Sequence, residues 1–130
     1  MATPCFVPVS IGELVDKYTI LNIKLDSVKN HEQIAMVAKE LDYLKPLVET
    51  HHVDRALMTE LTRVNQALWD VEDQLRHKEN AQSFDDAFVQ LARRVYILND
   101  LRADIKRNIN VQSKSCLTEV KSYASLPKAA

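Results

Sequence analysis

The sequence predicts an all-α protein: a four-helix antiparallel bundle in which the last two helices form a long hairpin, followed by an irregular C-terminal tail. The 130-residue chain contains one glycine, Gly12, whereas strand-and-turn folds need glycine in their tight turns. Apolar residues also recur at alternating spacings of four and three residues, which is typical of helices. Hydrophobic residues make up 46% of the chain and charged residues 27%, which is the composition of a globular protein. We therefore expect a single helical domain.

Capping signals and apolar stripes predict the first two helices. Ser10-Ile-Gly-Glu13 matches a capping box, in which the serine hydroxyl and the glutamate satisfy backbone amides of the first turn. A stripe of apolar residues then continues to Val28. Asn30 is a plausible cap for a second helix that begins near His31, and Pro46 should end or kink that helix because it lacks an amide hydrogen.

The third and fourth helices are predicted to be longer. Asp54 is a possible cap for a third helix that runs to about Lys78, and Ser83-Phe-Asp-Asp86 offers a cap for a fourth that runs to about Asn110. The short connection over 78–83 makes these two helices antiparallel neighbours. We divide the chain into an N-terminal arm over 1–9, a helical bundle over 10–112 and a C-terminal tail over 113–130.

Several classes of function are excluded by composition and spacing. Phosphate-binding loops need several glycines close together, and this chain has one. Cys5, Cys116 and the adjacent His51-His52 do not match a zinc or disulfide pattern, so we expect no metal and no cofactor. Residues 101–130 carry six Lys/Arg against two Asp/Glu, too sparse a charge for a nucleic-acid surface. Without a signal peptide or a long apolar run, we expect a cytoplasmic protein that binds neither nucleic acid nor membrane.

Arg102 is the one charged residue on the apolar line of the fourth helix. At 100° per residue, several other polar and aromatic side chains on the first, third and fourth helices turn toward the same inner region. The candidate anion-binding residues are Arg102, Lys106, Lys17 and Lys24; the candidate pocket-lining residues are Asn65, Trp69, Glu72, Tyr96 and Asn99. We expect these cations to share one cavity lined by Trp69.

Two interpretations of this polar set remain open. In the first, the set is structural: Glu72 pairs with Arg102, and the lysines extend their ammonium groups into water. In the second, the cations bind a phosphate or carboxylate metabolite, and Glu72 acts as a general acid or base. Small helical chorismate mutases use such side chains, although this is an analogy of architecture only.

A metal-dependent pyrophosphohydrolase is a further all-helical alternative. Glu13-Leu-Val-Asp16 and Asp70-Val-Glu-Asp73 contain the paired acids that such an enzyme needs. However, Asp16 and Asp70 fall about 160–170° from the centres of their apolar stripes, so we expect both to face solvent. This geometry argues against that class.

Four strings resemble a small bacterial and phage family that is catalogued only as a domain of unknown function: SIGELVDKYTILNIKL, VNQALWDVEDQLR, FVQLARRVYILNDLRADIKRNIN and EVKSY. The resemblance spans most of the chain. Matching positions are Asp16, Lys17, Lys24, Asn65, Trp69, Glu72, Tyr96, Asn99, Asp100, Arg102, Lys106, Glu119, Lys121 and Tyr123. Val120 stands where the family has a second glutamate. The resemblance implies a genomic context of sugar-transfer and cell-surface polysaccharide genes, but no particular activity.

The sequence therefore favours a non-enzymatic binding or assembly protein with a structural polar network, and the alternative is a protein or enzyme that binds a small anion. We also expect a homodimer. Regular stripes on long helices can accept helices from another chain, and the last two helices extend beyond what the first two can cover.

Overall fold

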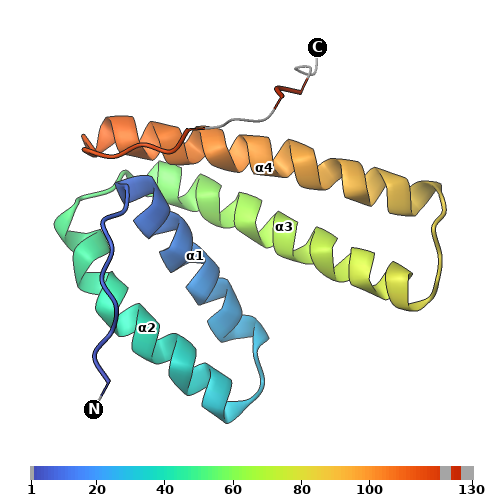
Figure 1. Cartoon of the computed structure of the whole chain (residues 1–130), viewed down its shortest axis with the longest axis horizontal. Coiled ribbons are helices and arrows are strands. Elements are labelled where there is room, and N and C mark those ends of the chain that lie inside the picture. Colours follow the sequence, from blue (N-terminus) through green and yellow to red (C-terminus); the bar gives the residue numbers. More distant parts are fainter. Residues whose placement is uncertain (1, 121–123, 127–130) are drawn as a thin grey trace.

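The computed structural model, which describes residues 2–120 and 124–126, confirms an all-α fold. Its four helices are α1 (Ile11–Ser27), α2 (His31–Thr50), α3 (Arg55–Asn80) and α4 (Asp86–Gln112), arranged as in Figure 1. No strand occurs within these described ranges. None of the helices found in them is long and apolar enough to cross a membrane.

The helices begin at the predicted capping signals. The side chains of Ser10, Asn30 and Asp54 each accept hydrogen bonds from backbone amides in the first turn of α1, α2 and α3. Within the string predicted to cap α4, the N-cap is Asp85, whose carboxylate accepts from the Phe88 amide at 2.9 Å. Acceptors at these positions satisfy amides that the helix itself leaves unpaired.

Two local expectations need correction. Pro46 does not end its helix, because α2 continues to Thr50. Pro46 lies on the exposed side of α2, where water can solvate the carbonyl that loses its amide partner. The capping box of α1 is also only half formed: Ser10 accepts from the Glu13 amide, but the Glu13 carboxylate binds Lys106 of α4 instead.

The helices are stacked in layers, with α1 in the middle. α3 and α4 form an antiparallel hairpin, α1 packs on both of them, and α2 contacts α1 but neither helix of the hairpin. Figure 1 shows α1 crossing one half of the hairpin while the other half extends past it. α1 therefore has two packed faces, one toward α2 and one toward the hairpin.

The main hydrophobic core lies where α1 crosses the hairpin. Val15 of α1, Leu61 of α3 and Ile109 of α4 are each 0% exposed and belong to one cluster, together with Val64 and Ile105. Burial of such side chains is the largest favourable contribution to folding. The core consequently fixes α1 at the end of the hairpin that contains the C-terminal half of α4.

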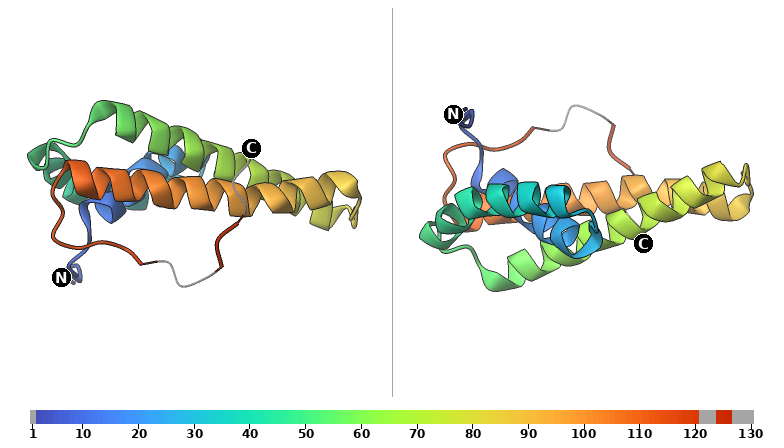
Figure 2. Two further views of the ribbon diagram at one scale, coloured as in Figure 1. Left: turned by 90° about the horizontal axis from the view of Figure 1, so that it is seen from above. Right: turned by 90° about the horizontal axis from the view of Figure 1, so that it is seen from below.

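The described part of the tail turns back along α4. Lys114 adopts a positive φ of 57°, and the Ser115 amide donates to the carbonyl of Asn110 at 2.8 Å. Residues 113–120 then run along α4 in the opposite direction (Figures 1 and 2). This reversal brings Glu119 beside Lys106, in the C-terminal half of α4.

Gly12 permits the close crossing of α1 and α4. A Cβ atom at this position would lie 2.5 Å from the carbonyl oxygen of Lys106 and 3.0 Å from Oδ1 of Asn110. The first of these neighbours is backbone, so it cannot move aside without moving α4. The only glycine of the chain therefore lies where two helix backbones meet.

We predict that Gly12→Ala lowers the free energy of unfolding by about 1–3 kcal/mol, because α1 must move away from α4 to relieve the overlap. The direction of the change is informative, because replacing glycine by alanine in an unobstructed helix stabilises that helix by about 1 kcal/mol. Urea denaturation measures the effect, and Gln33→Ala on the exposed surface of α2 is the control. A stabilised Gly12→Ala protein would contradict the close approach.

Candidate functional site

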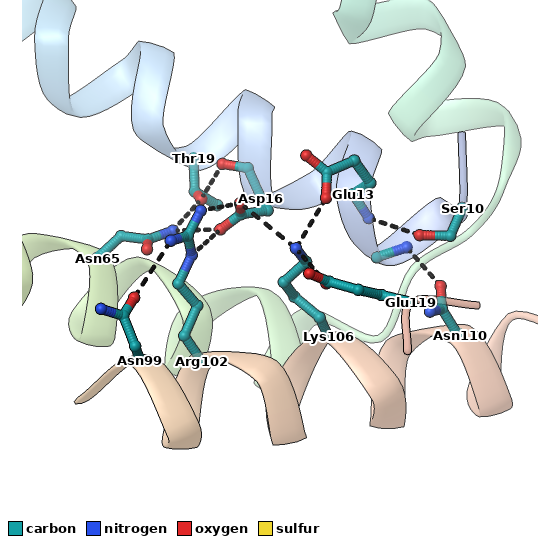
Figure 3. Close-up of polar contacts among 11 residues, drawn as sticks. Ser10, Glu13, Asp16, Thr19, Asn65, Asn99, Arg102, Lys106, Asn110 and Glu119 are labelled. Atoms are coloured by element: carbon teal, nitrogen blue, oxygen red, sulfur yellow. Dashed lines mark hydrogen bonds and ion pairs between the residues drawn. The ribbon is translucent and has the colours of Figure 1, made fainter. Parts of the chain in front are cut away.

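Asp16 and Arg102 form a bidentate ion pair between α1 and α4 (Figure 3). Nε of Arg102 donates to Oδ1 of Asp16 at 2.9 Å, and Nη2 donates to Oδ2. The Asp16 side chain is only 2% exposed and that of Arg102 is 29% exposed. Hydrogen bonding to this carboxylate raises the pKa of Arg102 and outweighs its partial burial. Arg102 thus compensates the charge of a buried acid.

Amide and hydroxyl groups complete the surroundings of Asp16. Nδ2 of Asn65, on α3, donates to Oδ1 of Asp16 at 3.0 Å and to Oγ1 of Thr19 at 2.9 Å. Nη1 of Arg102 also donates to Oδ1 of Asn99 at 3.4 Å. The pair therefore joins α1, α3 and α4 through one set of hydrogen bonds.

Lys106 lies one turn further along α4 and is surrounded by carboxylates. Its Nζ is 2.7 Å from Oε2 of Glu13, 2.8 Å from Oε2 of Glu119 and 3.9 Å from Oδ2 of Asp16. Its side chain is 7% exposed. Burial disfavours the charged amine, but hydrogen bonds to Glu119 and Glu13 prevail and raise the pKa of Lys106. This ammonium group links α1, α4 and the tail.

The N-terminus of α1 offers no free amides to an anion. The Ile11 amide donates to Oγ of Ser115 at 3.0 Å, the Gly12 amide to Oδ1 of Asn110 at 2.6 Å and the Glu13 amide to Ser10. A helix N-terminus can bind an anion only through amides that lack such partners. Side chains of α4 and the tail here take the place that an anion would occupy.

Two expectations, the exposure of Asp16 and the partner of Arg102, are corrected by this geometry. Asp16 does not face solvent; it is buried because α1 has a second packed face, opposite the apolar stripe used to predict its orientation. Glu72 is not the partner of Arg102, since Asp16 takes that role and Glu72 is exposed on α3. Asp70 is exposed, as expected.

The four candidate cations do not converge. Lys17 points to the α2 side of α1, where its Nζ lies 2.7 Å from Oε2 of Glu40, and its side chain is 55% exposed. Lys24 is also exposed, near the end of α1. The shared cavity expected for Lys17, Lys24, Arg102 and Lys106 is therefore wrong, because Lys17 meets α2 whereas Arg102 and Lys106 meet other residues of α1 on the side of α4.

Two cavities flank Arg102. The Trp69 groove has a volume of about 570 Å³ and is lined by Ile20, Asn65, Leu68, Trp69, Glu72, Asp73, Arg76, Asn99 and Arg102. The tail-side pocket has a volume of about 610 Å³ and is lined by Glu13, Tyr96, Asn99, Asp100, Arg102, Ala103, Lys106, Glu119, Ala124 and Leu126. The candidates Asn65, Trp69, Glu72 and Asn99 thus share the Trp69 groove with Arg102. Tyr96 and Lys106 line the other cavity.

Sequence reasoning placed Asn65 and Asn99 in this region but missed the acids that bind the two cations. A second line on α1 contained the signal: Gly12, Asp16, Thr19 and Ile23 follow one another at alternating spacings of four and three residues, and all four are buried. Only one of these four residues is a large apolar residue, so periodicity selects the more hydrophobic stripe of α1 as its buried face. For Glu119, no periodicity was available, because the tail is not helical there.

The site contains no group of His, Cys, Asp and Glu suited to a metal ion among the residues that the structure describes. The Lys106 ammonium lies among Glu13, Asp16 and Glu119, and it supplies the positive charge that these three carboxylates need. Lys121 and Tyr123, two positions of the family resemblance, lie outside the described residues.

The model of one protein family matches residues 5–129 and is described as a family of unknown function, DUF6165. The chain belongs to this family. No curated protein and no solved structure matches the chain. Membership of DUF6165 confirms the resemblance seen in the sequence and adds no activity to it.

We predict that Arg102→Leu lowers the free energy of unfolding by about 3–5 kcal/mol, because it leaves the buried Asp16 carboxylate without its cation. The double variant Asp16→Leu/Arg102→Leu should recover most of this loss, since both charges are then absent. Urea denaturation of the two single variants and the double variant measures the coupling. Glu72→Leu, on the exposed surface, should change stability by less than about 0.5 kcal/mol. Simple additivity of the two single losses would contradict the pairing.

A second prediction concerns alkaline pH. A group whose pKa is raised by folding stabilises the protein fully below its unfolded pKa, and this contribution is lost as the pH rises through the folded pKa. For Lys106 the unfolded value is near 10.5, so its stabilisation should persist at neutral pH and disappear above that value. Denaturation between about pH 9 and pH 12 should show the stability difference between wild type and Lys106→Met shrinking with pH. A difference that is constant across this range would contradict a charged Lys106.

Proposed function

We propose that this DUF6165 protein is a non-enzymatic binding or assembly protein, whose inward polar cluster holds the helices in place. The observation that carries the proposal is the internal balance of the cluster. Arg102 and Lys106 are matched by Asp16, Glu13 and Glu119. Two cations and three carboxylates leave no positive surplus for an anionic substrate.

Hydrogen-bond satisfaction supports the same conclusion. Each of the three guanidinium nitrogens of Arg102 donates to Asp16 or Asn99. Among the described residues, no buried side-chain nitrogen or oxygen lacks a hydrogen-bond partner. These bonds satisfy the buried part of the network, and a buried network that is satisfied mainly specifies one arrangement of helices.

The exposed apolar residues supply the binding surface in this proposal. The hairpin exposes large apolar side chains on α3, on α4 and in the connection between them: Trp69, Phe84, Val89, Tyr96, Ile97 and Leu101. These residues lie on more than one side of the hairpin, and Ile97 and Leu101 are neighbours on one side of α4; exposed apolar patches often mark contacts with other proteins. The polysaccharide gene context implied by the resemblance stays a prediction, because the family match carries no activity.

A second candidate function is favoured by one contact. Glu119, whose side chain is 57% exposed, places a carboxylate from the tail on the buried ammonium of Lys106. An external carboxylate or phosphate that displaced Glu119 would meet Lys106 and the exposed edge of Arg102, in a cavity of about 610 Å³. The alternative is therefore a small-anion binding protein or enzyme in which the tail competes with the ligand.

A thermal-shift experiment separates the two functions, because a ligand that binds only the folded state raises its melting temperature. Inorganic phosphate, nucleotides and small carboxylates would be tested on wild type, Glu119→Gln and Lys106→Met. We expect no increase that depends on Lys106. An anion that stabilises Glu119→Gln more than wild type, and has no effect on Lys106→Met, would favour the second function and contradict the first.

The control for this screen is Lys17→Met. It removes the same charge from an exposed position on the α2 side of α1, away from both cavities. An effect of anions that is lost equally in Lys17→Met and Lys106→Met reflects general electrostatic screening, which falls with increasing ionic strength, and counts as absence of a site.

A further inference from the structure

A line of exposed residues runs along the outer side of α4. It consists of Gln90, Arg94, Ile97, Leu101, Asp104 and Asn108, which follow one another at alternating spacings of four and three residues. All six are exposed, including the two apolar members: Ile97 is 57% exposed and Leu101 is 47% exposed. We call these six residues the outer stripe of α4.

The outer stripe lies away from the side of α4 that meets α1 and the tail. At 100° per residue, its centre lies about 120° around the helix from Arg102 and about 160° from Lys106. Arg102 and Lys106 are the residues that meet α1 and the tail. The Trp69 groove and the tail-side pocket both include Arg102 and contain no residue of the outer stripe. The outer stripe is thus a separate surface.

The stripe is complementary to itself when its direction is reversed. Ile97 and Leu101 lie two residues on either side of Asn99, Arg94 and Asp104 lie five residues on either side, and Gln90 and Asn108 lie nine on either side. Reversing the stripe about Asn99 therefore exchanges apolar with apolar, cation with anion and amide with amide. Such a surface fits a second copy of itself in an antiparallel orientation.

We propose that two copies of this chain form a homodimer by antiparallel packing of their outer stripes. This inference rests on the proposed assembly function and names its partner. Ile97 of one copy packs against Leu101 of the other at the centre, and Arg94 faces Asp104 on both sides. Because the interface has two-fold symmetry, each contact occurs twice. The stripe extends over about 27 Å at 1.5 Å per residue.

Charge decides both the partner and the orientation. In a parallel pair, Arg94 would face Arg94 and Asp104 would face Asp104, whereas the antiparallel pair replaces both repulsions with attractions. An unrelated partner has no reason to require this reversal symmetry. Within one chain, Asp104 contacts Arg107 at 3.6 Å, and both of these side chains are more than half exposed, so Asp104 can exchange that weak contact for Arg94 of a second copy.

The test reverses each charge in turn in the full-length chain. In either Arg94→Asp or Asp104→Arg, two attractive contacts become two repulsive ones, so the dimer dissociation constant should rise roughly tenfold or more. The double variant Arg94→Asp/Asp104→Arg restores opposite charges and should dimerise like wild type. Light scattering and sedimentation equilibrium measure the mass, which for wild type should be twice the 14.9 kDa of one chain.

Mixing the two single variants gives the most specific result. One variant then carries two acids at these positions and the other carries two bases, so the antiparallel heterodimer has two attractive contacts. We expect a dimer in the mixture under conditions where each single variant alone is monomeric. Lys45→Asp, a charge reversal on exposed α2, is the matched control and should remain dimeric.

Three results would overturn the proposal: a monomeric wild type at high protein concentration, a dimer that is insensitive to both single reversals, or single variants that do not recover when they are mixed. An insensitive dimer would place the interface elsewhere, such as the Trp69 groove. None of these results depends on the polar cluster or on an anion, so this test and the thermal-shift screen can fail separately.

Discussion

The buried carboxylate of Asp16 constrains the position of α1 more than any other group. A charge at 1% exposure is tolerated only with a cation and further donors around it, and here the guanidinium of Arg102 comes from α4 and the amide of Asn65 from α3. Because hydrogen bonds form only over a limited range of distances and angles, they fix the rotation and register of α1 on the hairpin. Gly12, one turn earlier, allows the backbones of α1 and α4 to come close enough for these bonds to form.

The middle position of α1 explains most features of the candidate site. A helix with one packed face can keep its polar residues in water, but α1 lies between α2 and the hairpin. Its second line of Gly12, Asp16, Thr19 and Ile23 is buried, and so are Ile11, Leu14 and Leu21 of its apolar stripe. The polar residues of the second line then require partners, and α3, α4 and the tail supply them. The polar cluster follows from this layering.

The carboxylates around Arg102 and Lys106 bear directly on what this region can bind. Viewed along the sequence, Arg102 and Lys106 look like excess positive charge on the C-terminal part of α4. In the structure, three carboxylates from α1 and the tail surround them. A phosphate or carboxylate would have to replace a group that is already covalently part of the chain and is therefore present at high effective concentration. The outer stripe of α4 requires no such displacement, and this favours assembly over anion binding.

The sequence by itself determined the helices, their caps at Ser10, Asn30 and Asp54, the antiparallel hairpin and the inward orientation of Arg102, because each depends on local spacing and on side chains within a few residues. The tertiary structure decided which partner each inward residue meets. Asp16 rather than Glu72 binds Arg102, Lys17 pairs with α2 instead of joining Arg102, and Glu119 reaches Lys106 across a turn of the tail. These outcomes depend on the order of the layers, and helical periodicity cannot reveal that order because it gives one face of a helix without saying how many faces are covered.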